Sequence, residues 1–148
     1  MPAGTSYLFK EGMLSSRIKK KEFPYNDRKE YYAIEVKNHF LHAVHPLAWI
    51  KRIKIEIDGN EISNEKSKFV LRDQWFQIEN MRTITEVYWN LAEKAEICIP
   101  QSEKLSLGRH QVKLTFYMSM LEDTQIMDTK DLWPLRVEMI EEVLEVIE

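Results

Sequence analysis

The sequence is poor in the residues that several classes of active site require. It has one cysteine, Cys98, which excludes an intrachain disulfide and any zinc site built from several cysteines. It has only four glycines, and they are too scattered to form a glycine-rich loop that cradles phosphate groups. A Gly-x-Ser-x-Gly motif is also absent, which excludes the nucleophile elbow of the α/β-hydrolases.

A strong net charge and a long apolar run are missing as well. The 21 basic and 24 acidic residues leave a net charge of −3, whereas a nucleic-acid-binding domain is usually markedly basic. The longest stretch without a charged residue, Asn38 to Ile50, has thirteen residues and is too short to cross a bilayer. The first residues lack the basic-then-apolar layout of a signal peptide. We therefore expect a cytoplasmic protein that binds neither nucleic acid nor a membrane.

What the sequence does contain is an alternation of apolar and polar residues with a period of two. This period is typical of strands that bury one face and expose the other. It is clear at 32–36, 53–57, 95–99 and 112–118, and weaker at 13–18, 69–71, 75–78 and 84–89. Turn signals such as Asp58-Gly59 separate the strands. About eight short strands predict an all-β protein, an antiparallel two-sheet β-sandwich over residues 1–121.

The last 27 residues, 122–148, differ in composition. They hold nine acidic and two basic residues. Their apolar residues recur at the spacing of a helix face, at Val137, Ile140, Leu144 and Ile147. We expect residues 122–148 to form an acidic C-terminal extension, either a solvated tail or a helix. It would pack on the sandwich or dock on another subunit through Trp133-Pro134-Leu135.

Three of the four histidines lie in the charge-free stretch. Imidazole is a common metal ligand, but His42 on a strand would face away from His39 and His45, and the proline after His45 disfavours a helix. An apolar surface loop is typical of an interface. We therefore expect His39, Phe40, His42, His45 and Trp49 to contact a partner and no metal to bind there. A small histidine-based metalloenzyme remains an alternative hypothesis.

No side chain of this sequence is predicted to be catalytic. Cys98 stands between two isoleucines of a strand, where a structural thiol is expected. Tyr88 and Trp89 could stack on a sugar or an aromatic ring, but Trp89 could equally cover the core. We include both among the contact residues at a partner or at the edge of an active site. With Trp75 they would form the stacking platform of an alternative, a stand-alone carbohydrate-binding module.

The central block of the sequence resembles the β subunits of bacterial C-glycoside deglycosidases. The resemblance covers roughly residues 30–121 and rests on the order and spacing of short motifs. These are His45-Pro46-Leu47, then Ile53-Lys54-Ile55-Glu56-Ile57-Asp58-Gly59, then Tyr88-Trp89-Asn90-Leu91-Ala92-Glu93-Lys94-Ala95, then Leu107-Gly108-Arg109-His110-Gln111-Val112. The sequence departs from the family pattern in its histidine-rich loop and its long acidic C-terminal segment.

The resemblance implies a hetero-oligomer in which this chain is the non-catalytic subunit. The partner would be a TIM-barrel α subunit that binds a divalent metal, typically manganese. It would cleave the carbon–carbon bond between a 3-oxo-sugar and an aromatic, flavonoid-type aglycone by deprotonation and elimination. This chain would then bind no cofactor itself, would be inactive when isolated, and would wall or order the loops at the catalytic face of the barrel.

Overall fold

The computed structural model describes residues 12–22, 30–39, 44–100, 104–118 and 136–147. They form eleven strands and two short 3₁₀-helices. In chain order these are β1 (Leu14–Glu22), β2 (Glu30–Lys37), β3 (Val44–Pro46), η1 (Leu47–Trp49), β4 (Ile50–Ile57), β5 (Asn60–Ile62), β6 (Lys68–Leu71), β7 (Gln74–Gln77), η2 (Ile78–Thr83), β8 (Tyr88–Asn90), β9 (Lys94–Pro100), β10 (Gly108–Met118) and β11 (Arg136–Val146). In the described part of the chain, neither helix has the length or hydropathy needed to span a bilayer.

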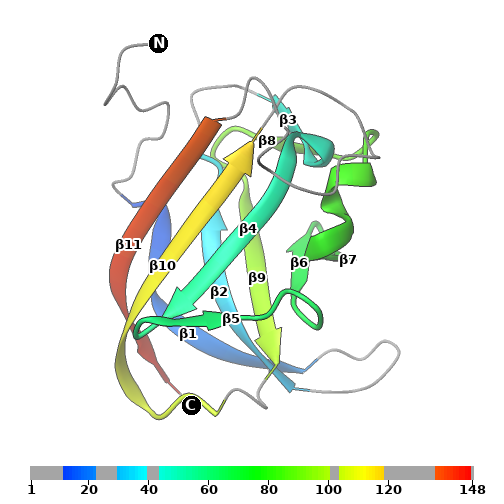
Figure 1. The fold of residues 1–148 in the computed structure, drawn as a ribbon. Coiled ribbons are helices and arrows are strands. Elements are labelled where there is room, and N and C mark those ends of the chain that lie inside the picture. Colours follow the sequence, from blue (N-terminus) through cyan, green and yellow to red (C-terminus); the bar gives the residue numbers. More distant parts are fainter. Residues whose placement is uncertain (1–11, 23–29, 40–43, 101–103, 119–135, 148) are drawn as a thin grey trace.

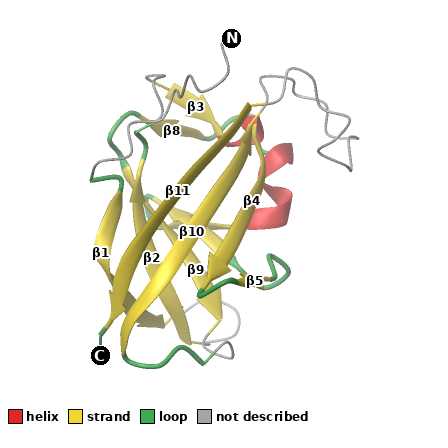
Figure 2. Cartoon of the chain, turned by 60° about the vertical axis from the view of Figure 1, so that its left-hand side comes forward, coloured by secondary structure: helices red, strands yellow, loops and turns green. Residues whose placement is uncertain are grey.

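Nine of the strands form one curled sheet, in the order β5-β4-β10-β11-β1-β2-β9-β6-β7. The sheet bends back on itself, so β4, β10 and β11 face β2 and β9 across the core (Figure 1). All of its pairings are antiparallel except one, because β1 and β11 run parallel. A second sheet consists of β3 and β8 alone and lies at one end of the curled sheet, which we call the β3–β8 end (Figure 2).

The core fills the concave side of the curled sheet. The alternation seen in the sequence places Ile53, Ile55 and Ile57 of β4 inside, together with Val112, Leu114 and Phe116 of β10. The helix η2 lies beside β4, and the N–H groups of Leu47 and Ala48 in η1 donate to the carbonyls of Val87 and Ile84 at 2.9 Å each. The helices therefore cover the core at the side where the sheet does not close.

Two hairpins turn through residue pairs with positive φ. Asp58 and Gly59 have φ of 52° and 83° between β4 and β5, which confirms the turn expected there. Arg72 and Asp73 have φ of 49° and 64° between β6 and β7. Positive φ at both central residues is typical of the type I′ turn, whose twist matches that of the flanking strands. The second turn was not expected, because neither of its residues is a glycine.

The all-β class is confirmed, but the sheet arrangement differs from the predicted two-sheet sandwich. Period-two alternation reports which residues face inward, and it does so equally for two flat sheets and for one curled sheet. Which strands pair depends on contacts between distant residues, such as the parallel register that sets Arg17 of β1 beside Glu145 of β11. The local alternation of apolar and polar residues does not contain this information about strand pairing.

The predicted helix within residues 122–148 is wrong for the part that the structure describes. Residues 136–146 form β11, which pairs along its whole length with β10 and also contacts β1. This segment is therefore a strand inside the nine-stranded sheet. Trp133-Pro134-Leu135 lie outside the described residues.

Candidate partner-binding site at the β3–β8 end

The structure gathers the described members of the predicted contact set at the β3–β8 end. Backbone pairing sets His45 of β3 opposite Trp89 of β8, and Pro46 opposite Tyr88. His39 follows β2 at the same end, and Trp49 closes η1, directly after β3. His39 and Trp49 are both half-buried. Phe40 and His42 lie outside the described residues, and for His45 only the backbone is described.

Asn38 fixes the chain just before His39. Its side-chain amide donates to the carbonyl of Trp89 at 2.8 Å, and its backbone N–H donates to the carbonyl of Glu93 at 3.1 Å. Its own carbonyl accepts the N–H of Ala92 at 2.8 Å. Asn38 is completely buried, and a buried amide that satisfies its hydrogen bonds in this way holds two segments together. The end of β2 is thus attached to the turn between β8 and β9.

Trp89 and Tyr88 have opposite environments because successive strand residues point to opposite sides. Trp89 is fully buried, its ring meets Phe69 edge-on at 5.3 Å, and its Nε1–H donates to the carbonyl of Glu93 at 2.8 Å. Tyr88 is 45% exposed. Of the two interpretations of Trp89, the core one is therefore correct, and its side chain cannot touch a partner or a sugar.

The stacking platform of the alternative hypothesis is accordingly not formed. It required Trp75, Tyr88 and Trp89 on one surface, and Trp89 lies inside. The ammonium of Lys68 lies 4.6 Å from the ring centroid of half-buried Trp75, so one face of that ring is already occupied by a cation. Tyr88 is left as the exposed aromatic residue of the three.

An ion pair braces the turn that follows Tyr88. The guanidinium of Arg72 contacts both carboxylate oxygens of Glu93 at 2.5 and 2.6 Å and donates to the carbonyl of Tyr88 at 2.9 Å. Glu93 also accepts the backbone N–H of Asn90 at 3.0 Å. Partial burial alone would raise the pKa of Glu93, but the bonds from Arg72 and Asn90 outweigh burial and lower that pKa. Leu91, three residues after Tyr88, is 52% exposed on this braced turn.

Sequence reasoning identified Tyr88 but missed the residues that position it. Asn38 begins the charge-free stretch and Glu93 lies within a quoted motif, yet their roles depend on contacts across 51 and 21 residues. Arg72 gave no signal, since an isolated arginine in a turn is ordinary.

A second arrangement, at the opposite end of the sheet, has the residue types of a catalytic triad. His110 Nδ1 lies 2.5 Å from a carboxylate oxygen of Asp58, and its Nε2 lies 2.7 Å from the backbone carbonyl of Ser106 and 3.4 Å from the Ser106 hydroxyl. Asp58 also accepts the Gln111 N–H at 2.9 Å. Both ring nitrogens face acceptor oxygens, and only the protonated ring donates to both. In that state the ring has no lone pair with which to activate a serine.

The electrostatics of this end agree with a structural clamp. Burial would lower the pKa of His110, but the hydrogen bonds to Asp58 and to the Ser106 carbonyl outweigh burial and raise it. The bond from His110, helped by the Gln111 N–H, lowers the pKa of Asp58. Through its two contacts, His110 of β10 ties the β4–β5 turn to the loop before β10.

We expect this clamp to make stability depend on pH. A histidine with a raised folded pKa contributes its full stability below the unfolded value of about 6.5, and that stability is lost as pH rises through the folded pKa. The expected loss is about 1 kcal/mol, because Asp58 is half exposed and screened by solvent. Thermal unfolding of the wild type, His110→Gln and Asp58→Asn between about pH 6 and pH 9 measures it. The wild-type midpoint should fall over this interval and both variants should respond less; an equal response from all three would contradict the clamp.

No three histidine, cysteine, aspartate or glutamate side chains approach closely enough to hold a metal ion in the described part of the chain. Cys98 is buried on β9. Fold and site thus define an all-β chain in which the exposed Tyr88 lies on β8 and the exposed Leu91 on the braced turn that follows it.

Comparison with known families identifies the chain more closely. The family model of the C-glycoside deglycosidase beta subunit matches residues 13–121, well over half of the chain. The chain belongs to this family, as its motifs suggested. A search of curated proteins returned no match. The family match ends before β11.

Proposed function

We propose that this chain is the non-catalytic β subunit of a cytoplasmic enzyme complex that cleaves aromatic C-glycosides. The observation that carries the proposal is the hydrogen bonding within the triad-like group of Asp58, His110 and Ser106. Both ring nitrogens of His110 contact acceptor oxygens, one on Asp58 and one on the Ser106 carbonyl, so neither nitrogen is left free to act as a base. Membership of a family of deglycosidase β subunits supports the same division of labour.

The reaction that we propose for the complex needs chemistry of another kind. A carbon–carbon link offers no leaving oxygen to protonate, so the paired carboxylates of ordinary glycosidases cannot cleave it. A ketone at sugar C3 acidifies the proton on C2. A general base would then remove that proton, and a divalent metal, manganese in this proposal, would supply positive charge to the oxygen that becomes negative. The flavonoid-type aglycone leaves from C1 as electrons return from the enolate, and a proton is added to the aglycone carbon. Metal, base and acid would belong to a TIM-barrel α subunit.

The part of this chain that we assign to the barrel is the β3–β8 end. Tyr88 and Leu91 present exposed apolar area there, and tyrosine is enriched in interfaces because an apolar ring carries a polar tip. Arg72, Glu93 and Asn38 fix the backbone beneath them. A surface held in its bound conformation loses little entropy on binding. It could then cover loops of the barrel and exclude water from the reaction.

Co-expression with a barrel-type α subunit tests this function. We expect the isolated chain to release no aglycone from a 3-oxo C-glucoside and the co-purified complex to do so. Release by the isolated chain would refute the proposal, and so would failure of the two chains to co-elute.

Two leucines of similar exposure locate the contact. Leu91→Ala and Tyr88→Ala should weaken binding of the barrel subunit by about tenfold or more each. Leu107→Ala should leave it unchanged, because Leu107 is 55% exposed but precedes β10 at the opposite end of the sheet. Titration of each purified variant with the α subunit measures the difference. Equal affinities for the variants at Leu91 and Leu107 would remove the β3–β8 end from the interface.

A further inference from the structure

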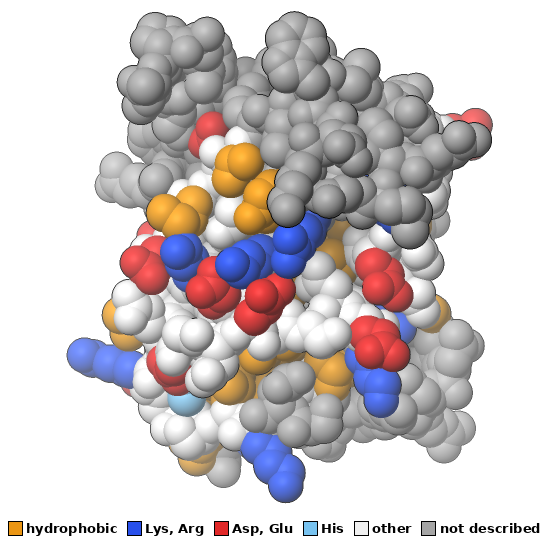
Figure 3. Space-filling model, viewed as in Figure 1, with side chains coloured by type: hydrophobic (Ala, Val, Ile, Leu, Met, Phe, Trp, Pro, Cys, Tyr) orange, Lys and Arg blue, Asp and Glu red, His pale blue; other side chains and the backbone are white. Residues whose placement is uncertain are grey.

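The convex face of β10 and β11 is a second surface with unusual composition. Its three exposed apolar side chains are all on β11, where Val137, Met139 and Val143 are 48%, 41% and 59% exposed. Large apolar groups on the solvent side of a strand at the middle of a sheet contribute nothing to the core. Figure 3 shows this face, with hydrophobic groups above a band in which basic and acidic side chains alternate.

The register of β10 and β11 orders these side chains into pairs. On the convex face Tyr117 is opposite Val137, Thr115 opposite Met139, Lys113 opposite Glu141, Gln111 opposite Val143 and Arg109 opposite Glu145. Two pairs unite opposite charges, and one unites an aromatic ring with an aliphatic side chain. The central pair is Lys113 and Glu141, each the middle residue of an eleven-residue strand.

We propose that this face binds a second copy of the chain about a twofold axis that runs parallel to the strands, between β10 and β11. Such an axis lays β10 of each copy over β11 of the other, at the same height along the strand. Each side chain of β10 then meets, in the second copy, the same residue that is its neighbour within its own sheet. Lys113 faces Glu141, Arg109 faces Glu145 and Tyr117 faces Val137, each contact occurring twice. The surface is thus complementary to itself.

The size of the face also favours a second copy. The strands β4, β1, β10 and β11 have eight, nine, eleven and eleven residues and together span about 19 Å, so a contact over all four would cover about 630 Å² per copy. Two such faces total about 1,260 Å², at the lower end of the range of stable, specific interfaces. Aligned sheets pack with their strands rotated by about 30°. The contacts at the middle of the strands, those of Lys113 with Glu141, are therefore displaced least by this rotation.

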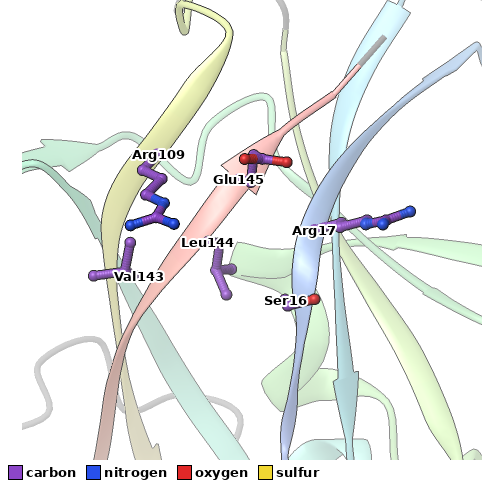
Figure 4. A pocket seen from close by; sticks show the side chains of 6 residues that line it. All are labelled: Ser16, Arg17, Arg109, Val143, Leu144 and Glu145. Atoms are coloured by element: carbon purple, nitrogen blue, oxygen red, sulfur yellow. The ribbon is translucent and has the colours of Figure 1, made fainter.

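A shallow depression extends the face toward β1. It has a volume of about 410 Å³ and is lined by Ser16, Arg17, Arg109, Val143, Leu144 and Glu145. Figure 4 shows Glu145 on β11 between the strands that carry Arg109 and Arg17, in agreement with the register. The hollow holds Glu145 between Arg17 and Arg109, and in the proposed arrangement its Arg109 faces Glu145 of the second copy.

Charge exchange at the central pair tests the arrangement. In Lys113→Glu, each copy would set a glutamate against Glu141 of the other, and Glu141→Lys would set lysine against Lys113. Each variant alone should dimerise at least about tenfold more weakly than the wild type. Mixed together they should form a heterodimer, because glutamate at 113 then faces lysine at 141 and Lys113 faces Glu141. Each chain retains its own like-charged neighbours, so recovery in the mixture reports contact between copies.

Sedimentation of the full chain at high micromolar concentration measures all three samples. Where the chain is purified with its barrel partner, the same variants are compared in the complex by mass. Lys66→Glu is the control, since Lys66 is exposed in the loop between β5 and β6 and should leave dimerisation unchanged. A monomeric wild type, dimers that survive both exchanges, or a mixture that stays monomeric would each overturn the proposal. A barrel subunit bound at this face would give the first of these results, because it would exclude the second copy. The inference does not depend on the proposed catalytic partner.

Discussion

Removing residues 122–148 is expected to leave a chain that does not fold. The family match ends at residue 121, so this truncation would be a natural choice for a minimal domain. It removes β11 from between β10 and β1 and deletes the buried side chains of Ile140, Leu144 and Val146. It also leaves β10 without one of its two neighbouring strands, along all eleven residues. Unpaired strand edges of that length promote aggregation.

The measurement is near-ultraviolet circular dichroism together with size-exclusion chromatography. We expect no fixed aromatic signal and elution as aggregate. The matched control keeps the full length and carries Val137→Thr and Val143→Thr on the exposed side of β11, which should preserve the folded signal because threonine suits strands. A truncated chain with the dichroism and cooperative unfolding of the full one would show that β11 is dispensable.

Trp89→Ala is expected to lower the free energy of unfolding by about 3–5 kcal/mol, the usual cost of truncating a large buried aromatic residue. The change removes the edge-on contact with Phe69 and the indole bond to the Glu93 carbonyl. It leaves a cavity beneath the turn that carries Leu91. Since many domains have only 5–15 kcal/mol of stability, this variant should be close to unfolding.

Urea denaturation followed by far-ultraviolet dichroism measures the loss. Tyr88→Ala is the internal comparison, because it changes the neighbouring residue of the same strand on the exposed side and should cost within about 0.5 kcal/mol. Similar losses for the two variants would contradict the buried and exposed assignments.

Much of the fold was predictable because its signals are local. The isoleucines of β4 and the apolar residues of β10 alternate without interruption, and Asp58-Gly59 marks the turn after β4. The single curled sheet was not predictable, since it depends on pairings such as β1 with β11 at opposite ends of the sequence.

The error at β11 has a specific cause. Its inward positions alternate Glu138, Ile140, Glu142 and Leu144, and its outward positions include valines. Acidic residues on the inner side and apolar ones on the outer side hide the period of two. Burial raises the pKa of Glu142, as expected for a carboxyl on the inner side. What remained was a chance match to the spacing of a helix.

The candidate site was predictable as a region but not residue by residue. The motif around Tyr88 located the β3–β8 end, yet the sequence could not say whether Tyr88 or Trp89 pointed outward. A strand of three residues has no periodicity long enough to set its phase.

The parallel contact of β1 with β11 has a consequence for how the protein is made. A ribosome releases β1 first, but the strand that must lie beside it comes from the last part of this sequence. During synthesis β1 has only β2 to pair with, and the gap in the sheet persists until translation reaches Val146. Proteins whose contacts join such distant residues fold slowly. The nascent chain therefore exposes the unpaired edge of β1 to its surroundings. Chaperones or early association with another subunit would have the greatest effect at this edge.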